Sequence, residues 1–386
     1  MTEVSHAVPE PFSINIPDDV LNDLAARLAM SRIPARSATG WCAGTDPDYL
    51  RELVAYWREG FDWRARQRDL NKFPQFTAEV DGRLVHFVHL RAAGDRSGPP
   101  LPLILTHGWP SSFVEMLTIA RMLADPAAHG APPGAVAFDV VVPSLPGFLF
   151  SEAPGPSAST ADHTAATWAK LMTEVLGYER FGAYGGDVGS QVTDFLAAQY
   201  PNLVAGMYTH HPCLHPVDRE HPPLSEAETA YLADRAAQPD DDSAYSAVQA
   251  TRPDTLAAAL LDSPSGLAAW IVEKYRAWGD CDGDLESRFD KDLLLTVITL
   301  YWVTGSIGTS FQPYYDDAHT PPLPAVTVPA GVTVTREDAA YPREFAQRTY
   351  RDLRSWREAQ SGRHFLPLEE PAVIASHLRD FFSTLA

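Results

Sequence analysis

The chain has 386 residues, of which 45% are hydrophobic and 21% charged, proportions that are ordinary for a soluble globular protein. Its formal net charge of −20 argues against nucleic acid or an anionic membrane as the main partner, because both attract basic surfaces. The three cysteines, Cys42, Cys213 and Cys281, are widely spaced and form no CxxC pair, so neither a disulfide framework nor a zinc site is indicated.

The sequence carries no sign of a membrane span or of a leader. No run of about 18 apolar residues occurs, and the N-terminal stretch MTEVSHAVPEPFSINIPDD lacks the basic start and the apolar run of a secretory signal. We therefore expect a soluble, cytoplasmic protein without a membrane partner. A composition rich in Ala, Arg, Asp and Pro is typical of a high-GC bacterium, and a homodimer is compatible with these features.

The first of four regions, residues 1–95, predicts helices followed by a hairpin. Apolar residues recur at helical spacing in IPDDVLNDLAARL and again in DPDYLRELVAYWREGF, after an interruption at Pro34. FTAEVDGRLVHFVHL then alternates on both sides of Asp81-Gly82, which is typical of two strands joined by a tight turn. We expect this region to be an N-terminal extension that packs on the core.

The second region, residues 96–212, alternates strands with helices. LPLILTHGWP, FDVVVPSLPGF and FGAYGG are predicted strands, and TWAKLMTEVLG and SQVTDFLAAQY are predicted helices. Such alternation predicts an α/β fold, with a mostly parallel central sheet and helices on both faces.

The third and fourth regions complete this pattern. Residues 213–322 show no clear strand and are predicted to be a helical insertion above the sheet. Residues 323–386 return to the core with a strand in PAVTVPAGVTV and a helix over YPREFAQRTYRDL. A further strand is expected before SGRHF, and a last helix from about Pro371.

The motif YGGDVGS joins a predicted strand to a predicted helix. Gly185 and Gly189 supply the small residues that a sharp strand-to-helix turn requires around a nucleophile. Asp187 stands where many hydrolases carry a serine. Taken alone, this aspartate is equally well explained as the N-cap of the following helix.

Two further segments favour a catalytic role for Asp187. THGWP follows a strand, as does the loop that aims a backbone N–H into such sites, so Trp109 and Val188 are candidates for an oxyanion hole; an ordinary Gly-Trp-Pro turn is the alternative. His364 lies near the C-terminus, and the order nucleophile, acid, histidine places the acid at Glu337 or Asp338.

An aspartate nucleophile favours a particular chemistry. Its carboxylate is already ionised at neutral pH and attacks an alkyl carbon, which leaves an alkyl-enzyme ester. His364 then activates water against that ester. The leaving group is a halide or an epoxide oxygen, and an epoxide oxygen needs a proton donor such as a tyrosine hydroxyl.

The chain resembles the microsomal-type epoxide hydrolases nearly from end to end. The pieces that carry the resemblance are FSINIPDDVLNDLAARL, THGWPSSFVEM, DVVVPSLPGFLFS, YGGDVGS, TRPDTLAAALLDSPSGLAAWIVEKY, LYWVTGSIGTSFQPYY and RHFLPLEEP. It implies an α/β-hydrolase fold with a helical lid and an N-terminal epoxide hydrolase segment. It also implies that an epoxide and water become a vicinal diol without cofactor or metal, with Asp187 as nucleophile and His364 as general base.

The same resemblance assigns the remaining site residues. The two lid tyrosines that bind and protonate the epoxide oxygen fall on Tyr245 and Tyr314, with Tyr315 beside the second. The acid falls on Asp338, where the family commonly has Glu, and Glu337 is the runner-up. Members of this kind act in detoxification or in natural-product biosynthesis, including on aryl epoxides.

Two alternative functions remain at this stage. A haloalkane dehalogenase-like hydrolase uses the same framework, but Val188 stands where such enzymes hold the halide with a Trp. A non-catalytic ligand-binding protein is the other alternative, against which the full set of candidate residues argues. The cluster of His210, His211 and His215 is more typical of a structural segment than of a metal site, so we expect no metal.

Overall fold

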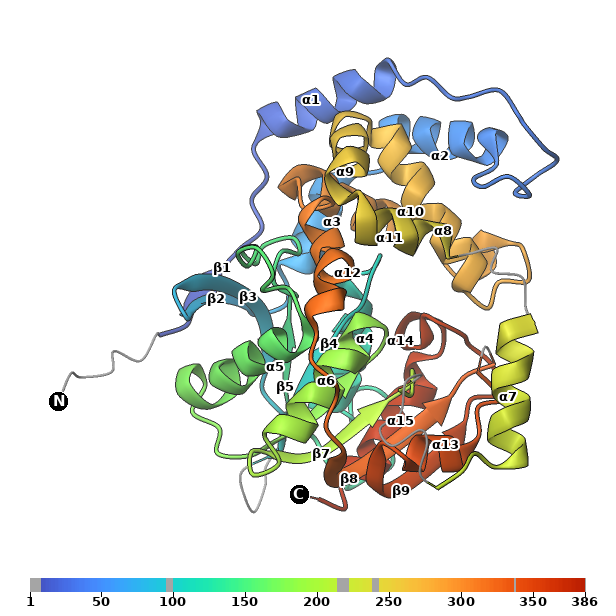
Figure 1. Cartoon of the computed structure of the whole chain (residues 1–386). Helices are drawn as coiled ribbons and strands as arrows, with labels where there is room; N and C mark the ends of the chain where they lie inside the picture. Colours follow the sequence, from blue (N-terminus) through green and yellow to red (C-terminus); the bar gives the residue numbers. More distant parts are fainter. Residues whose placement is uncertain (1–7, 95–99, 214–221, 238–242, 337, 386) are drawn as a thin grey trace.

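The computed structural model describes residues 8–94, 100–213, 222–237, 243–336 and 338–385 (Figure 1). These residues build a nine-stranded sheet with the order β1-β2-β3-β5-β4-β6-β7-β8-β9. The first three strands and the junction of β3 with β5 are antiparallel, and all pairs from β5 to β9 are parallel. The prediction of a mostly parallel α/β sheet is thus confirmed. The strands are β1 Glu10–Phe12, β2 Gln75–Val80, β3 Arg83–Leu90, β4 Pro102–Thr106, β5 Asp139–Pro143, β6 Phe181–Gly185, β7 Val204–Thr209, β8 Val326–Val334 and β9 Tyr350–Glu358.

Helices cover both faces of the sheet. Helix α6 packs with α5 and lies against β4, β6, β7 and β8, whereas α15 packs with α4 and against β8. The glycines of β6 separate the two faces, since an added Cβ at Gly182 would meet Phe382 of α15 and one at Gly185 would meet Thr193 of α6. The core helices are α4 Leu117–Ala124, α5 Ala161–Lys170, α6 Val188–Gln199, α13 Arg343–Gln347, α14 Leu366–Glu369 and α15 Pro371–Phe382.

A helical lid is inserted between β7 and β8, and the N-terminal helices brace it (Figure 1). Helices α1 and α2 pack against α10, and α2 and α3 pack against α11. Arg27 donates to Asp262 at 2.8 Å, and the Tyr56 hydroxyl donates to Asp292 at 2.8 Å. The helices involved are α1 Asp18–Ala29, α2 Pro47–Glu59, α3 Trp63–Leu70, α7 Glu226–Ala237, α8 Ala244–Thr251, α9 Pro253–Asp262, α10 Pro264–Trp278, α11 Lys291–Thr304 and α12 Gln312–Asp316.

The hairpin predicted at Asp81-Gly82 is present between β2 and β3. Both turn residues have positive φ, 52° at Asp81 and 76° at Gly82, which is the backbone that a two-residue turn between twisted strands requires. The pairing of Val80 with Arg83 closes the turn directly. Because β3 continues into the antiparallel junction with β5, this hairpin attaches the N-terminal region to the central sheet.

The predicted helix over YPREFAQRTYRDL is wrong in its second half. Only α13 is helical, and β9 begins at Tyr350 and pairs with β8. Tyr350 is fully buried and its hydroxyl donates to Asp194 of α6 at 3.0 Å, so tertiary contacts outweigh the local helical spacing. Strand β1 was not predicted, and β7 was anticipated only as a strand that leads into THHPCLH, without bounds. Strand β7 contains Gly206, where an added Cβ would meet Leu385.

A helix that crosses a membrane must be long and apolar, and the helices of the described ranges differ from this in length or composition. None of them is by itself long and apolar enough, although two bent pairs, α9 with α10 and α11 with the segment Thr309–His319, reach that length and composition together.

Candidate active site

Three of the site segments leave the sheet at the same edge. Thr106 at the end of β4 lies opposite Gly185 of β6, and Gly185 lies opposite Thr209 of β7. Because these strands are parallel, the residues that follow them, in THGWP, GGDVG and THHP, come together at their carboxyl ends. In open α/β sheets this is the edge at which ligands bind.

The backbone at Asp187 has a conformation that L-residues seldom adopt, with φ 54° and ψ −127°. Glycines make this turn possible, because an added Cβ at Gly186 would collide with the His210 ring and one at Gly189 would collide with the Thr106 carbonyl. An added Cβ at Gly108 would collide with the Asp187 side chain itself. The local sequence therefore forces this side chain away from the sheet, directly ahead of α6. No side-chain capping bond is found at Asp187, which disfavours the N-cap explanation.

Backbone amides hold the Asp187 carboxylate. The Trp109 N–H donates to Asp187 Oδ1 at 2.8 Å, and the Val188 N–H also bonds this carboxylate. Burial raises the pKa of Asp187, and the two amides partly offset this by favouring the ionised form. Glu115 lies close to Asp187 and to Gly108 of the THGWP turn. Burial raises the pKa of Glu115 to about 8, so its carboxyl group is neutral at pH 7.

His364 lies beside Asp187. Its Nε2 is 3.7 Å from Asp187 Oδ2, too long for a direct hydrogen bond. The imidazole packs against the rings of His211 and Trp278, with centroids 4.5 Å and 4.7 Å away. Burial, with the nearby His210 and Arg363, lowers the pKa of His364 to about 3. It is therefore neutral at pH 7 and able to accept a proton.

Two further histidines support this pair. The Asp187 N–H donates to His211 Nδ1 at 2.7 Å. The Tyr184 hydroxyl and His210 Nδ1 are 2.8 Å apart, and His210 Nε2 lies 3.2 Å from the His364 carbonyl. The tautomer that satisfies both His210 contacts accepts from Tyr184 and donates to that carbonyl. Sequence reasoning gave these histidines a structural role; the bounds of strand β7 would have placed them at the site edge.

The two candidate tyrosines come together over the THGWP turn. Tyr245, near the start of α8, stacks on the Trp109 ring with centroids 5.3 Å apart. Tyr314 of α12 meets the Trp109 ring edge-on at 5.9 Å and the Tyr245 ring at 5.8 Å. Burial, the charge of Asp187 and a hydrogen bond to Tyr245 raise the pKa of Tyr314 well above its ordinary value. Tyr315 is instead half-exposed.

The acid candidates follow β8. The Asp338 carboxylate is 8% exposed and lies 3.6 Å from Arg235 of α7. Burial raises the pKa of Asp338, and the charge of Arg235 opposes that shift. Among the residues described, no hydrogen bond or ion pair joins Asp338 to His364. Glu337 lies outside the described residues. The choice between the two acids stays a prediction.

Two lid residues near Tyr245 were not singled out from the sequence. The Lys274 side chain is only 5% exposed, and its Nζ lies 4.7 Å from the Tyr245 ring centroid. Trp278, one turn further along α10, contacts the Tyr245 ring at 5.0 Å. The sequence feature that could have indicated Lys274 is its position beside Tyr275, among the apolar residues that α10 buries.

Within the described ranges no group of three or more His, Cys, Asp or Glu side chains lies close enough together to hold a metal ion. His210 uses both ring nitrogens in the contacts above. His215 lies outside the described residues.

An aspartate on a glycine-packed turn, two amides on its carboxylate and a neutral histidine at the same sheet edge define an α/β-hydrolase site. Two family models match the chain, one described as "Epoxide hydrolase N terminus" over residues 9–116 and one as "alpha/beta hydrolase fold" over residues 102–259.

Whole-chain comparisons agree with these matches. A Stigmatella aurantiaca protein named "Putative epoxide hydrolase" is 40% identical, over 97% of this chain and 85% of that protein. "Epoxide hydrolase 1" of Sus scrofa is 33% identical, over 97% of this chain and 88% of that protein. The structure of Aspergillus niger epoxide hydrolase superposes with a TM-score of 0.84 at 30% identity, covering 98% of this chain and 97% of that one. The chain belongs to the epoxide hydrolase family, which confirms the predictions of family, fold and hydrolase class.

Proposed function

We propose that the protein hydrolyses an epoxide to a vicinal diol through a covalent ester on Asp187. The observation that carries this proposal is the placement of Asp187. One carboxylate oxygen accepts the Trp109 N–H at 2.8 Å, and the other lies 3.7 Å from a neutral His364. Oδ2 thus faces the imidazole of His364, which suits attack by this oxygen in one step and proton transfer to His364 in the next.

In the first step, Asp187 Oδ2 attacks an epoxide carbon and the ring C–O bond breaks. The oxygen that leaves carbon takes a proton from a tyrosine hydroxyl. Tyr245 and Tyr314 suit this role because their rings contact each other and Trp109, whose N–H holds the nucleophile. A neutral hydroxyl is required for donation, and the raised pKa of Tyr314 keeps that residue protonated at neutral pH.

In the second step, water attacks the ester carbonyl carbon of Asp187. His364 takes the proton from this water, and its Nε2 faces the carboxylate that becomes the ester, 3.7 Å from Oδ2. The Trp109 and Val188 amides stabilise the tetrahedral oxyanion. When it collapses, the bond between the Asp187 carboxyl carbon and the diol oxygen breaks, and that oxygen takes the proton from protonated His364. The proton of the new carboxylic acid returns to the tyrosinate left by the first step, which regenerates both the carboxylate and the tyrosine hydroxyl. Asp338, or Glu337, orients His364.

A single turnover in water enriched in heavy oxygen tests this mechanism. Because the diol leaves with the attacking oxygen of Asp187, the first diol contains no label in its new hydroxyl and the enzyme gains one label at Asp187. Label that enters the first diol directly, with none in a peptide containing Asp187, contradicts the covalent route.

We further propose that the substrate is an aryl epoxide, handled in detoxification or natural-product biosynthesis. Aromatic rings surround the THGWP turn, since Trp109 contacts Tyr245, Tyr314, Trp278 and Phe311. Such rings favour stacking with an aryl group. Comparing enantiopure styrene oxide with 1,2-epoxyhexane, with product stereochemistry recorded, tests this; equal or higher kcat/KM for the aliphatic substrate contradicts it.

A further inference from the structure

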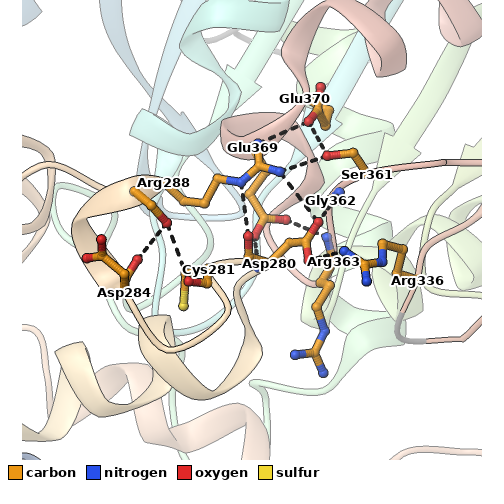
Figure 2. A network of polar contacts seen from close by, with 11 residues as sticks. Asp280, Cys281, Asp284, Arg288, Arg336, Ser361, Gly362, Arg363, Glu369 and Glu370 are labelled. Carbon is orange, nitrogen blue, oxygen red and sulfur yellow. Dashed lines mark hydrogen bonds and ion pairs between the residues drawn. The ribbon is translucent and has the colours of Figure 1, made fainter.

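The loop that carries His364 is tied to the lid by a network of buried carboxylates (Figure 2). Asp280 directly follows Gly279 at the end of α10, and its side chain is 4% exposed. Its Oδ2 accepts the Gly362 N–H at 2.8 Å, and its Oδ1 accepts from Arg336 at 2.8 Å. One carboxylate thereby joins three segments that are far apart in the sequence.

A second carboxylate continues the same connection. Glu369 Oε2 accepts the Arg363 N–H at 2.5 Å, and Glu369 Oε1 accepts the Asp280 N–H at 2.5 Å. The His364 N–H is in turn directed at the Trp278 carbonyl at 3.3 Å. The backbone N–H groups of residues 362, 363 and 364 therefore donate to Asp280, to Glu369 and to the Trp278 carbonyl, respectively. Asp280 and Trp278 lie at the end of α10, and Glu369 is the carboxylate that accepts the Asp280 N–H.

Two arginines hold the charge of this network. Arg288 donates to the Asp280 carbonyl at 3.0 Å, to Ser361 at 2.7 Å and to Glu370 at 3.0 Å (Figure 2). Burial by itself raises the pKa of Asp280, but the Gly362 amide and the charges of Arg336 and Arg288 outweigh it, and the pKa lies below its ordinary value. Asp280 therefore stays ionised and accepts several donors at once.

The network connects both loops of the hydrolytic step. Arg336 immediately precedes the two acid candidates, and its own N–H donates to the Gly362 carbonyl at 3.3 Å. Gly362, with φ 90°, turns the chain two residues before His364. A shift at Asp280 would therefore move His364 and the loop of the acid candidates together, whereas the Asp187 carboxylate is held by the Trp109 and Val188 amides.

We propose that Asp280 is a positioning residue for His364, needed for hydrolysis of the covalent ester but not for its formation. The proposal rests on the two-step mechanism given above. Attack on the epoxide uses Asp187 and the tyrosines, and the hydrogen bonds and ion pairs of Asp280 within the described ranges run instead to Gly362, Arg336, Arg288 and Glu369. Attack of water on the ester uses His364, whose loop Asp280 holds through Gly362 and Arg336.

The test follows the two steps separately. Enzyme is mixed with excess styrene oxide, quenched in acid from milliseconds to seconds, and the fraction that carries an adduct is read by intact-protein mass spectrometry. For Asp280→Asn we expect ester formation within about 2-fold of the native rate. Ester hydrolysis and kcat should fall about 10- to 100-fold, the effect of misplacing a catalytic group by about 1 Å. The ester should then accumulate.

Matched variants make the result specific. Asp284→Asn changes an exposed carboxylate in the same loop and should behave as the native protein. Asp280→Glu retains the charge and should recover part of the hydrolysis rate. Arg336→Met removes one half-exposed donor and keeps Asp280, so it should slow hydrolysis in the same direction by a smaller factor. This variant decides the question if Asp280→Asn does not fold.

Failure of this inference is distinguishable from failure of the mechanism. His364→Gln should trap the ester on Asp187; if neither this variant nor the native protein ever carries an adduct, the covalent mechanism is wrong. If His364→Gln traps the ester but the Asp280 and Arg336 variants hydrolyse it at the native rate, the role of Asp280 is overturned. A parallel loss of ester formation and hydrolysis also overturns it, because that is the result of general destabilisation.

Discussion

Asp187 and His364, the proposed nucleophile and the proposed base, are held by different kinds of contact. Asp187 is fixed by glycines within two residues of it, where an added methyl group would collide with backbone or ring atoms. It is also fixed by Gly108 of the THGWP turn, where such a group would collide with the Asp187 side chain itself. His364 is fixed by carboxylates from elsewhere, such as Asp280, which is 82 residues from Gly362 in the chain. Steric crowding places the first group and charge-assisted hydrogen bonds place the second, so the two should respond differently to substitution.

The largest effect should come from the acid that orients His364. The Asp338 carboxylate lies 3.6 Å from Arg235, so for this test we expect Glu337 rather than Asp338 to orient His364. Glu337→Gln should then slow ester hydrolysis by about 10²- to 10⁴-fold, the range for loss of a catalytic base or its orienting acid. Asp338→Asn should change it by less than about 10-fold. Stopped-flow and quench measurements on both variants check this, and the reverse ranking would assign the acid to Asp338.

The crowded turn should be broken by one methyl group. In Gly186→Ala the new Cβ runs into the His210 ring, so either the Asp187 turn or β7 must shift. We expect a loss of about 1–3 kcal/mol in the free energy of unfolding, the usual cost of overpacking, and a slower formation of the ester. Urea denaturation and the quench assay measure the two effects.

Gly155→Ala is the matched control for this turn, because its added Cβ would meet only the end of the Arg83 side chain at 3.4 Å. Native stability and ester formation in Gly186→Ala would show that the turn tolerates a side chain, and the steric half of the comparison would then be wrong.

A smaller effect is expected at Lys274, which is part neither of the crowded turn around Asp187 nor of the carboxylate network around His364. Its ammonium group lies over the Tyr245 ring and favours the negative charge that grows there as the proton moves to the epoxide oxygen. A partly desolvated cation–π contact is worth about 1–2 kcal/mol, so Lys274→Met should slow ester formation by about 5- to 30-fold and leave ester hydrolysis unchanged. Lys170→Met, on the exposed side of α5, is the control. A slower hydrolysis step would instead connect Lys274 to the base.

The same contrast explains how much the sequence predicted. The turn at Asp187, the hairpin at Asp81-Gly82 and the buried strands depend on neighbouring residues, so their patterns are visible locally. The strand at Tyr350 was mistaken for helix because its pairing with β8 and its bond to Asp194 come from distant parts of the chain.

The supporting groups of the base were missed for the same reason. Asp280 lies in CDGD and Glu369 in PLEEP, two acidic segments that look like solvated turns until the fold brings them onto the amides before His364. The roles of Tyr245, Tyr314 and the acid came from a family resemblance rather than from local physics, and they stay predictions here.

The smallest effect concerns acid, and it acts on both halves of the site. Burial lowers the pKa of His107, under the nucleophile turn, and of His210, behind the base, to about 4 each. In the unfolded chain these histidines take up a proton near pH 6.5, whereas in the folded protein they stay neutral until about pH 4. The contribution of these two neutral histidines to the free energy of unfolding is therefore complete above pH 6.5. It falls as the pH drops towards 4, by up to about 1.4 kcal/mol per pH unit for each histidine.

His210→Gln removes one such group. The free energy of unfolding, measured by urea titration between pH 6 and pH 4.5, should therefore fall less steeply in this variant than in the native protein, by about that amount per pH unit. The exposed His129→Gln should retain the native slope. Equal slopes in all three proteins would mean that His210 is protonated in the folded state, and the hydrogen bond it donates to the His364 carbonyl would then no longer define a single neutral tautomer behind the base.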